Sequence, residues 1–292
     1  MFHTIALFGT GLIGGSFALA LRRRHPATRM VGFDRDLDAA RRALELGVID
    51  TIAADAAEAV RDADLVFLAV PVAQVPSLLG GIVDGLRDDA LITDAGSTKG
   101  DVVAAARAKL GPRIERFVPG HPIAGREVHG PDAALATLYD GRAVILTPLA
   151  ENAPQAIARV QALWADCGAR VTTMPVAQHD RVLAAVSHLP HMLSYALVAQ
   201  IVDSADAALK LGLAGAGFRD FTRIAASSPE MWRDVALANR EALLAELDDY
   251  IALVAGLRAS IAGSDGEALE ALFDKASRAR SAWKPAGPDV SA

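Results

Sequence analysis

An imidazole and a hydroxyl in the first half of the chain have the chemistry needed to take a proton from an alcohol. His121 stands between Gly120 and Pro122 and outside any apolar repeat, so we expect its ring to be displayed. Because imidazole titrates near neutrality, it can accept a hydroxyl proton while hydride leaves the same carbon. We predict that His121 is the catalytic base and that Ser97, in segment 94–100 (DAGSTKG), lies beside it. The alternative is a surface histidine that only makes a hydrogen bond.

A glycine pattern near the start of the chain predicts the acceptor for that hydride. Gly9, Gly11 and Gly14 match G-x-G-x-x-G, after a strand pattern and at the start of a helical one that contains Leu12 and Ile13. The glycines allow a tight turn, a close approach of pyrophosphate and close packing of helix on strand, while the helix N-terminus faces the phosphates. We assign all five residues to a dinucleotide site; a glycine turn that binds nothing is the alternative.

Four more residues extend that cofactor site. Asp34 ends the next strand pattern, 20 residues after Gly14, where a carboxylate accepts ribose hydroxyls and repels the 2′-phosphate of NADP. We therefore expect NAD, with NADP as the alternative. Arg35 could stack on adenine or pair with a phosphate. Val70 and Pro71, at the end of another apolar run, are assigned to the same site.

A third polar group lies in the second half of the chain. Arg223 follows Asp220 by three residues and Arg219 by four, so on a helix the three share one side. An arginine among apolar residues needs an anionic partner such as a substrate carboxylate; a weak surface ion pair is the alternative. His188 and His191 lack the further ligand that would complete a metal site. We expect no metal there and a polar pocket lining.

The elements that position these residues alternate between short apolar runs and helical periodicity. This predicts an α/β Rossmann-type, doubly wound parallel sheet, in which Ser97 and His121 converge on loops at the carboxyl ends of strands. Gly47 stands where a left-handed residue would end the second helix. The expected strands are residues 4–8, 29–34, 64–70, 90–93, 142–147 and 170–174, and the expected helices are 12–24, 37–46 and 154–166.

The strand pattern ends near residue 175, and the rest of the chain has helical periodicity. Ser228 and Pro229 offer an N-cap followed by a first-turn proline. We expect a Rossmann domain over residues 1–175, an all-helical domain over 176–283 and a disordered tail over 284–292. The expected helices cover residues 176–214, 229–261 and 265–282.

Composition limits the classes of function. The 292 residues carry a net charge of -6, which argues against a nucleic-acid binder because that needs a basic face. Cys167 is the only cysteine, so a reducing, cytoplasmic compartment fits best, and no secretory signal pattern is visible. No charge lies between Arg181 and Asp203, but polar residues near the middle of that span favour a buried helix and no membrane.

Five ordered motifs together resemble the prephenate/arogenate dehydrogenase (TyrA-type) family. They are GTGLIGGS, DAGSTKG, GHPIAGRE, SHLPH and FRDFTRIAASSPEMW, and they cover nearly the whole catalytic unit. The resemblance implies a Rossmann domain followed by a helical substrate and dimerisation domain, which forms a homodimer. It also implies NAD(P)-dependent oxidative decarboxylation of prephenate to 4-hydroxyphenylpyruvate, or of arogenate to tyrosine.

The resemblance implies a role for each site residue. His121 would accept the proton of the ring hydroxyl, and Ser97 would orient that hydroxyl and the histidine. Arg223 would hold a substrate carboxylate, with Asp220 fixing its direction. The remaining pocket residues would be Glu127, His188, His191 and Trp232, some of them contributed by the partner subunit.

Two substitutions leave the substrate open. Arg126 and His129 stand where many relatives carry Thr and Ser, so the preference is for prephenate, with arogenate or both as alternatives. A β-hydroxyacid dehydrogenase would rely on a lysine of the helical half, where Lys210 has no pocket context. A non-catalytic dinucleotide sensor would not need His121, Ser97 and Arg223 together.

Overall fold

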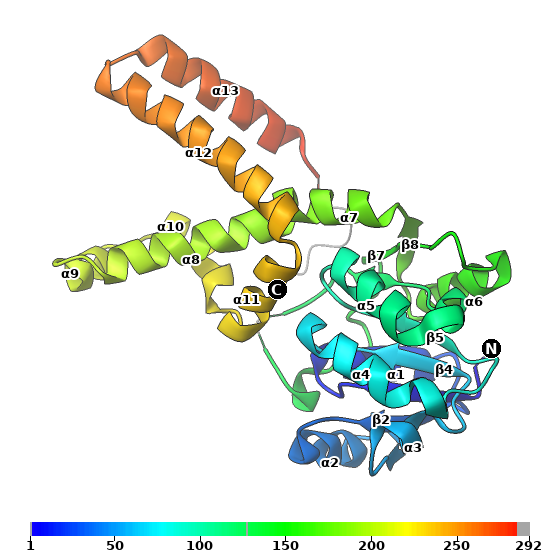
Figure 1. Cartoon of the computed structure of the whole chain (residues 1–292). Coiled ribbons are helices and arrows are strands. Elements are labelled where there is room, and N and C mark those ends of the chain that lie inside the picture. The colour runs from blue at the N-terminus through cyan, green and yellow to red at the C-terminus, as the bar shows by residue number, and fades with distance from the viewer. Residues whose placement is uncertain (1, 127, 285–292) are drawn as a thin grey trace.

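The computed structural model describes residues 2–126 and 128–284. An α/β half is followed by a helical half, from which two helical arms project (Figure 1). The last strand ends at Thr173 and the next helix begins at Val176, on either side of the predicted boundary at residue 175. Of the tail expected at 284–292, all but Lys284 lies outside the described residues.

The first half forms a five-stranded parallel sheet in the order β3-β2-β1-β4-β5, as the alternating pattern predicted. The two residues of β3 are too few to show a period, so the sequence did not reveal this strand. The strands are β1 (Thr4–Phe8), β2 (Arg29–Phe33), β3 (Thr51–Ile52), β4 (Leu65–Leu68) and β5 (Leu91–Asp94).

Alternate residues of each strand face opposite sides of this sheet. Ile5 and Leu7 of β1 belong to one buried cluster, and Ala6 and Phe8 belong to the other. Burying one Leu or Phe side chain contributes about 1.5–3 kcal/mol, so two filled faces hold the strand ends firmly. The first cluster includes residues of α1 (Leu12–Arg22) and α6 (Pro154–Asp166), and the second includes residues of α3 (Ala56–Val60), α4 (Val75–Ile82) and α5 (Gly100–Leu110).

Helix α2 (Leu37–Glu45) runs beside this sheet and ends as the sequence predicted. Its first turn is capped by the Asp36 side chain, which accepts from the backbone N–H groups of Asp38 and Ala39. Gly47 has φ +67°, the left-handed conformation that a glycine adopts without steric cost.

Three strands form a second sheet, which differs from the single parallel sheet expected. Strand β6 (Gly120–Pro122) is antiparallel to β7 (Ala143–Leu146), and β7 is parallel to β8 (Arg170–Thr173). A parallel neighbour needs a long crossover connection, usually a helix, and the described residues between β6 and β7 form only one short 3-10 turn. Helix α6 supplies such a crossover between β7 and β8. An isolated bridge pairs Ile92 of β5 with Phe117, shortly before β6.

The helical half begins with one long helix that contains a π-helical turn. It consists of α7 (Val176–Leu183), the π turn Ala184–His188 and α8 (Leu189–Val202). Pro190 has no N–H and its ring clashes with a normal helical turn, so the hydrogen bonding shifts: Leu189 N–H bonds to the carbonyl of Ala184. The helix expected at 176–214 therefore contains a π turn and ends at Val202.

The remaining helices follow the predicted order with different breaks. Ser228 caps α11 as predicted, its hydroxyl accepting from the N–H of Met231. The helix expected at 229–261 is interrupted at Asn239, whose φ and ψ of −103° and 33° are not helical. The elements are α9 (Ala207–Gly212), α10 (Ala216–Thr222), α11 (Pro229–Ala238), α12 (Arg240–Ala262) and α13 (Gly266–Ala282).

The helix Val176–Val202 is long and apolar enough to cross a membrane, judged by length and composition only. In the fold, its His179, Leu183, Ala184 and His188 are buried. These positions pack on the α/β half and on α12, so this part of the helix is a core helix.

Candidate active site

A cavity of about 720 Å³ lies at the carboxyl ends of β1, β2 and β4. Six of the nine predicted cofactor residues line it, while Leu12, Ile13 and Gly14 form the first turn of α1 behind it. The described helix start has no acidic residue in its first turn, which suits a phosphate. The lining residues that the sequence predicted are Gly9, Gly11, Asp34, Arg35, Val70 and Pro71.

Two of the glycines are required by contacts. Gly9 has φ +87°, and a Cβ atom there would lie 2.3 Å from the carbonyl oxygen of Ala69. A Cβ atom on Gly14 would lie 2.0 Å from the carbonyl oxygen of Gly9. A larger residue at either position would push the loop out of the shape that approaches a pyrophosphate.

Asp34 is held in place beside this loop. Its Oδ2 accepts from the Thr10 N–H at 2.8 Å and from the Thr10 hydroxyl at 3.0 Å, and its Oδ1 accepts from the Asp36 N–H at 3.0 Å. The carboxylate keeps lone pairs for ribose hydroxyls and places a negative charge where the 2′-phosphate of NADP would lie. The cavity therefore fits NAD.

His121 lies on a strand rather than on the loop that the sequence predicted. It is the middle residue of β6 and pairs with Ile145 of β7. A three-residue strand bounded by Gly120 and Pro122 has no apolar period, so the pattern did not show it. His121 is partly exposed as a residue, but its ring has lost its surrounding water and is less displayed than the sequence predicted.

The Nδ1 atom of His121 lies 2.9 Å from Nε2 of His179, and Nδ1 of His179 lies 2.8 Å from Oδ1 of Asp180. Asp180 also accepts from the backbone N–H groups of Lys99 at 2.9 Å and Gly100 at 2.7 Å. Burial alone would raise the pKa of Asp180, but these hydrogen bonds outweigh it and the pKa is lowered. An ionised carboxylate is thus hydrogen-bonded to His179, whose ring in turn contacts His121, an arrangement that the sequence did not reveal.

A buried ion pair fixes the strand that carries His121. The Nζ of Lys99 donates to Oδ2 of Asp94, and both side chains are fully buried. Lys99 also donates to the carbonyl of Gly120 at 2.8 Å, while the Gly120 N–H donates to Oδ1 of Asp94 at 3.0 Å. The sequence signal for this pair is an aspartate that closes an apolar strand five residues before a lysine.

The pKa of His121 lies well below its ordinary value of 6.5. Loss of water around the ring is the main cause, followed by the nearby positive or polar groups His179, Lys99 and His188. The ring is therefore neutral at pH 7 and has a lone pair to accept a proton. Among the described residues none bonds to its Nε2, so no protein group competes for the lone pair of this nitrogen.

Ser97 lies on the loop between β5 and α5, at the same edge as His121. Its backbone faces His188 and raises the pKa of that ring slightly against the dominant effect of burial. Within the described part of the chain no hydrogen bond joins the Ser97 hydroxyl to His121. The two segments meet through the hydrogen bonds that join Gly120 to Lys99 and Asp94, but not through the side chains of Ser97 and His121.

Three of the predicted pocket residues form one cluster. The ring of His191 stacks on Trp232 with centroids 3.5 Å apart, and His188 meets the same indole edge-on at 6.0 Å. Nδ1 of His188 lies 3.0 Å from Nδ2 of Asn239, and its buried Nε2 has no partner among the described residues. The histidines are thus joined to the α11–α12 junction and, through Asn239, to the Asp180 carbonyl.

The predicted carboxylate site is only partly assembled. Arg223 starts a 3-10 turn that packs beside α8, where the Tyr195 hydroxyl donates to the Ser227 carbonyl at 2.7 Å. Asp220 pairs with Arg219 at 3.2 Å, and both side chains are more than 70% exposed, so the apolar surroundings that we expected for them are absent within one chain. Glu127 lies outside the described residues.

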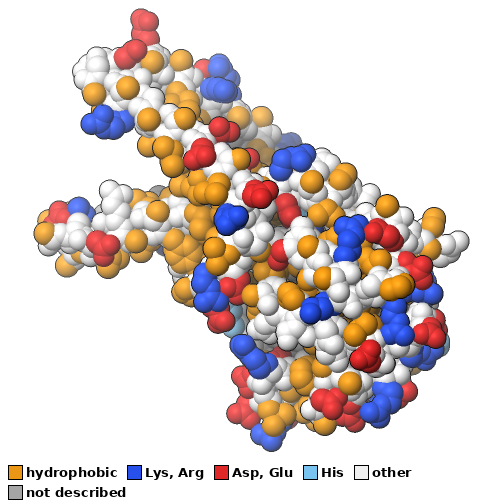
Figure 2. Space-filling model, in the orientation of Figure 1, with side chains coloured by type: hydrophobic (Ala, Val, Ile, Leu, Met, Phe, Trp, Pro, Cys, Tyr) orange, Lys and Arg blue, Asp and Glu red, His pale blue; other side chains and the backbone are white. Residues whose placement is uncertain are grey.

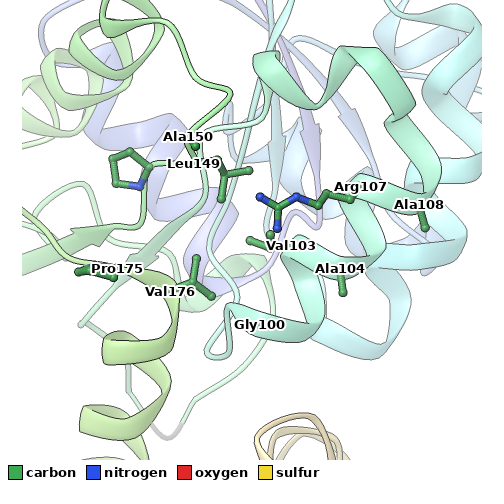
Figure 3. A pocket seen from close by; sticks show the side chains of 10 residues that line it. Gly100, Val103, Ala104, Arg107, Ala108, Leu149, Ala150, Pro175 and Val176 are labelled. Carbon is green, nitrogen blue, oxygen red and sulfur yellow. The ribbon is translucent and has the colours of Figure 1, made fainter.

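A second cavity, of about 770 Å³, lies between α5, the segment after β7 and the start of α7, and none of the predicted site residues lines it (Figure 3). Val103, Leu149 and Val176 give it an apolar lining. Its one charged group, Arg107, is paired with Glu151 at 3.0 Å. None of the residues that line it is an Asp, Glu or His. In residues 2–126 and 128–284 no cluster of three or more His, Cys, Asp or Glu side chains could hold a metal.

Two family models match the chain in sequence order. Residues 17–173 match the family described as prephenate dehydrogenase, nucleotide-binding domain, and residues 175–275 match prephenate dehydrogenase, dimerization domain. Together they cover most of the chain, and the change from one to the other falls where the last strand ends. The glycine loop lies just before the first matched residue.

Individual relatives agree with these matches. A cyclohexadienyl dehydrogenase of Zymomonas mobilis is 38% identical over 97% of both chains. A prephenate dehydrogenase of Bacillus subtilis is 39% identical over 94% of this chain and 75% of its own. A crystal structure of prephenate dehydrogenase from Aquifex aeolicus, in complex with hydroxyphenyl propionate and NAD+, superposes with a TM-score of 0.89 at 35% identity, covering 96% of this chain and 97% of that one.

Proposed function

Because the chain belongs to the prephenate dehydrogenase family, we propose that it catalyses the NAD-dependent oxidative decarboxylation of prephenate to 4-hydroxyphenylpyruvate. The observation that carries this proposal is a neutral imidazole with one engaged nitrogen, held next to the carboxyl end of β5 in the same α/β half as the cofactor cavity. NAD, when bound in that cavity, supplies the hydride acceptor.

His121 accepts the proton of the ring hydroxyl at Nε2 as hydride leaves the carbon that bears the hydroxyl. Loss of the ring carboxylate as CO2 then makes the ring aromatic, which drives the reaction without a metal or covalent intermediate. The product is a phenol, so the same imidazole can return its proton to the ring oxygen. Ser97 orients the substrate hydroxyl toward the imidazole of His121.

Binding of the substrate anion is assigned to the helical half. Prephenate carries two carboxylates, and Arg223 offers a planar donor pair that suits one of them. Asp220 adjusts the direction of that guanidinium, while His188, His191 and Trp232 line the pocket, together with Glu127. The stacking of His191 on Trp232 supports a preformed wall for a flat ring.

Arogenate is a second candidate substrate. The 38% identical relative is named a cyclohexadienyl dehydrogenase. Arogenate carries an ammonium group where prephenate carries a keto group, and Arg126 adds a positive charge five residues after His121. Like charges repel, so we expect prephenate to be preferred and arogenate to react more slowly.

We also propose that two chains form a homodimer through the helical half, in the cytoplasm. Figure 2 shows hydrophobic side chains gathered where α12 leaves the body of the molecule. Large exposed apolar surfaces mark interaction sites. The exposed large hydrophobic residues of α11–α13 include Leu237, Leu244, Ile251, Leu253, Val254, Ile261 and Phe273.

One assay tests the proposed reaction. The absorbance of reduced cofactor is followed with prephenate and with arogenate, each offered with NAD and with NADP. We expect the fastest turnover with prephenate and NAD. Tight NAD binding without turnover of either substrate would instead indicate a dinucleotide sensor, and sedimentation of the same sample reports whether it is a dimer.

A further inference from the structure

A line of three side chains leads away from the proposed base. His121 lies on β6 of the α/β half, whereas His179 and Asp180 lie on α7 of the helical half. Their successive contacts are 2.9 and 2.8 Å, within hydrogen-bonding range. His179 is fully buried, and among the described residues its two ring nitrogens contact only these two neighbours.

We propose that His179 and Asp180 are positioning residues that fix the tautomer of His121 and stabilise its protonated form. This inference rests on the role of His121 as the base. Ionised Asp180 can only accept, so Nδ1 of His179 carries a hydrogen. A neutral His179 then has a lone pair at Nε2, and Nδ1 of His121 must be the donor. The lone pair of His121 is thereby placed at Nε2, toward the substrate.

Asp180, at the end of this line, is itself held through its side chain and its backbone. The N–H groups of Lys99 and Gly100, at the start of α5, hold its oxygens. Asn239 donates to its backbone carbonyl at 2.8 Å from the α11–α12 junction. Asp180 therefore joins the Ser97 loop, α7 and α12, and the orientation of His121 depends on the contact of both halves of the chain.

The charges around the base explain why it needs this support. Lys99 faces His121 as a buried cation, but Asp94 is paired with it. His179 and His188 are the other titratable groups that face the ring. Asp180 is the remaining anion near them, so it is the group that stabilises the imidazolium formed when His121 takes a proton.

Paired variants test the role of His179. In His179→Leu the acceptor for His121 Nδ1 is lost, and we expect kcat to fall by at least about tenfold. In His179→Gln the side-chain oxygen can reach the position of Nε2, and we expect most of that loss to be recovered. His25→Leu, which removes another histidine paired with an aspartate at 2.7 Å, is the control and should keep wild-type kcat.

The pH dependence of kcat/KM distinguishes a positioning role from a purely structural one. In Asp180→Asn the anion is removed, the imidazolium is less stable, and the acid limb of kcat/KM should move to lower pH, by on the order of one unit. NAD affinity and thermal unfolding show that each variant is folded. Folded His179→Leu and Asp180→Asn enzymes with wild-type kcat and an unmoved limb would overturn the proposal, as would a Gln variant as slow as the Leu variant.

The wild-type protein gives a test that does not depend on turnover. With 15N-labelled imidazoles, the spectrum reports which nitrogen of each ring carries the hydrogen, and His121→Asn identifies the signals of His121. We expect Nδ1 protonated and Nε2 free; the opposite tautomer would overturn the inference. An active His121→Asn enzyme would instead refute the proposed base while leaving this reading of the tautomer intact.

Discussion

The buried ammonium of Lys99 donates a hydrogen bond to the backbone carbonyl of Gly120, the residue before His121, at 2.8 Å. The same ammonium neutralises Asp94, which in turn accepts from the Gly120 N–H. A single buried ion pair thus connects the end of β5 to β6 and sets the position of the proposed base.

Breaking this pair should destabilise the protein strongly. Lys99→Met leaves Asp94 buried and without its counter-charge, which costs about 3–5 kcal/mol. Urea unfolding measures that cost. Arg107→Met, on the same helix, breaks a half-exposed pair with Glu151 and should cost about 1 kcal/mol or less. Equal losses in the two variants would show that the buried pair has no special role.

Stability should fall in mildly acidic solution because of His188. Burial, opposed by nearby Asp180, lowers the pKa of His188 from 6.5 to about 4. Between these values the unfolded chain binds a proton that the folded chain does not. The contribution of neutral His188 to the free energy of unfolding is therefore fully present above pH 6.5. It is lost as pH falls toward 4, by up to about 1.4 kcal/mol per pH unit.

Unfolding free energies measured across that range test this effect. His188→Asn should show a smaller slope with pH than the wild type, whereas His3→Asn, at an exposed position, should keep the wild-type slope. An unchanged slope in the His188 variant would mean that this ring is protonated equally in the folded and unfolded chain.

Asp34 should determine the choice between cofactors. Asp34→Ser removes the charge that repels a 2′-phosphate, so the ratio of kcat/KM with NADP to that with NAD should rise by about tenfold or more. Asp36→Ser removes a negative charge two residues away and retains a residue that can cap α2. If both variants changed the ratio equally, the effect would come from net charge and not from the ribose site.

Arg223 should affect the binding of substrate more than its turnover. Arg223→Ala removes a charge-assisted hydrogen bond worth about 1.5–3 kcal/mol, so KM should rise by roughly ten- to hundred-fold with a smaller change in kcat. Arg219→Ala, which removes the exposed partner of Asp220, is the matched control. An unchanged KM in the Arg223 variant would exclude this residue from the substrate site.

Local patterns predicted residues that line one cavity, because the signals of the proposed cofactor site are local. Gly9 and Gly14 are required by contacts within one strand–turn–helix, and Asp34 is the end of the next strand. Requirements of this kind can be recognised from neighbouring residues in the sequence. The same holds for the Ser228 cap and for Gly47, because each depends only on the backbone conformation at one end of a helix.

The contacts that hold the proposed base in place could not be predicted from local patterns. His121 and His179 are 58 residues apart, and Lys99 and Asp180 are 81 apart, so only the packing of the two halves brings them together. The antiparallel direction of β6 depends on a connection without a helix. Asp220 shows a related limit: helical spacing favoured Arg223 as its neighbour, and the fold also pairs it with the adjacent Arg219.

Replacement of His121 by asparagine tests the central claim most directly. His121→Asn keeps a polar side chain of smaller size but cannot take a proton, so kcat with prephenate should fall by at least ~10²-fold while the affinity for NAD stays nearly intact. A variant that turned over prephenate at close to the wild-type rate would contradict the assignment of this imidazole as the base.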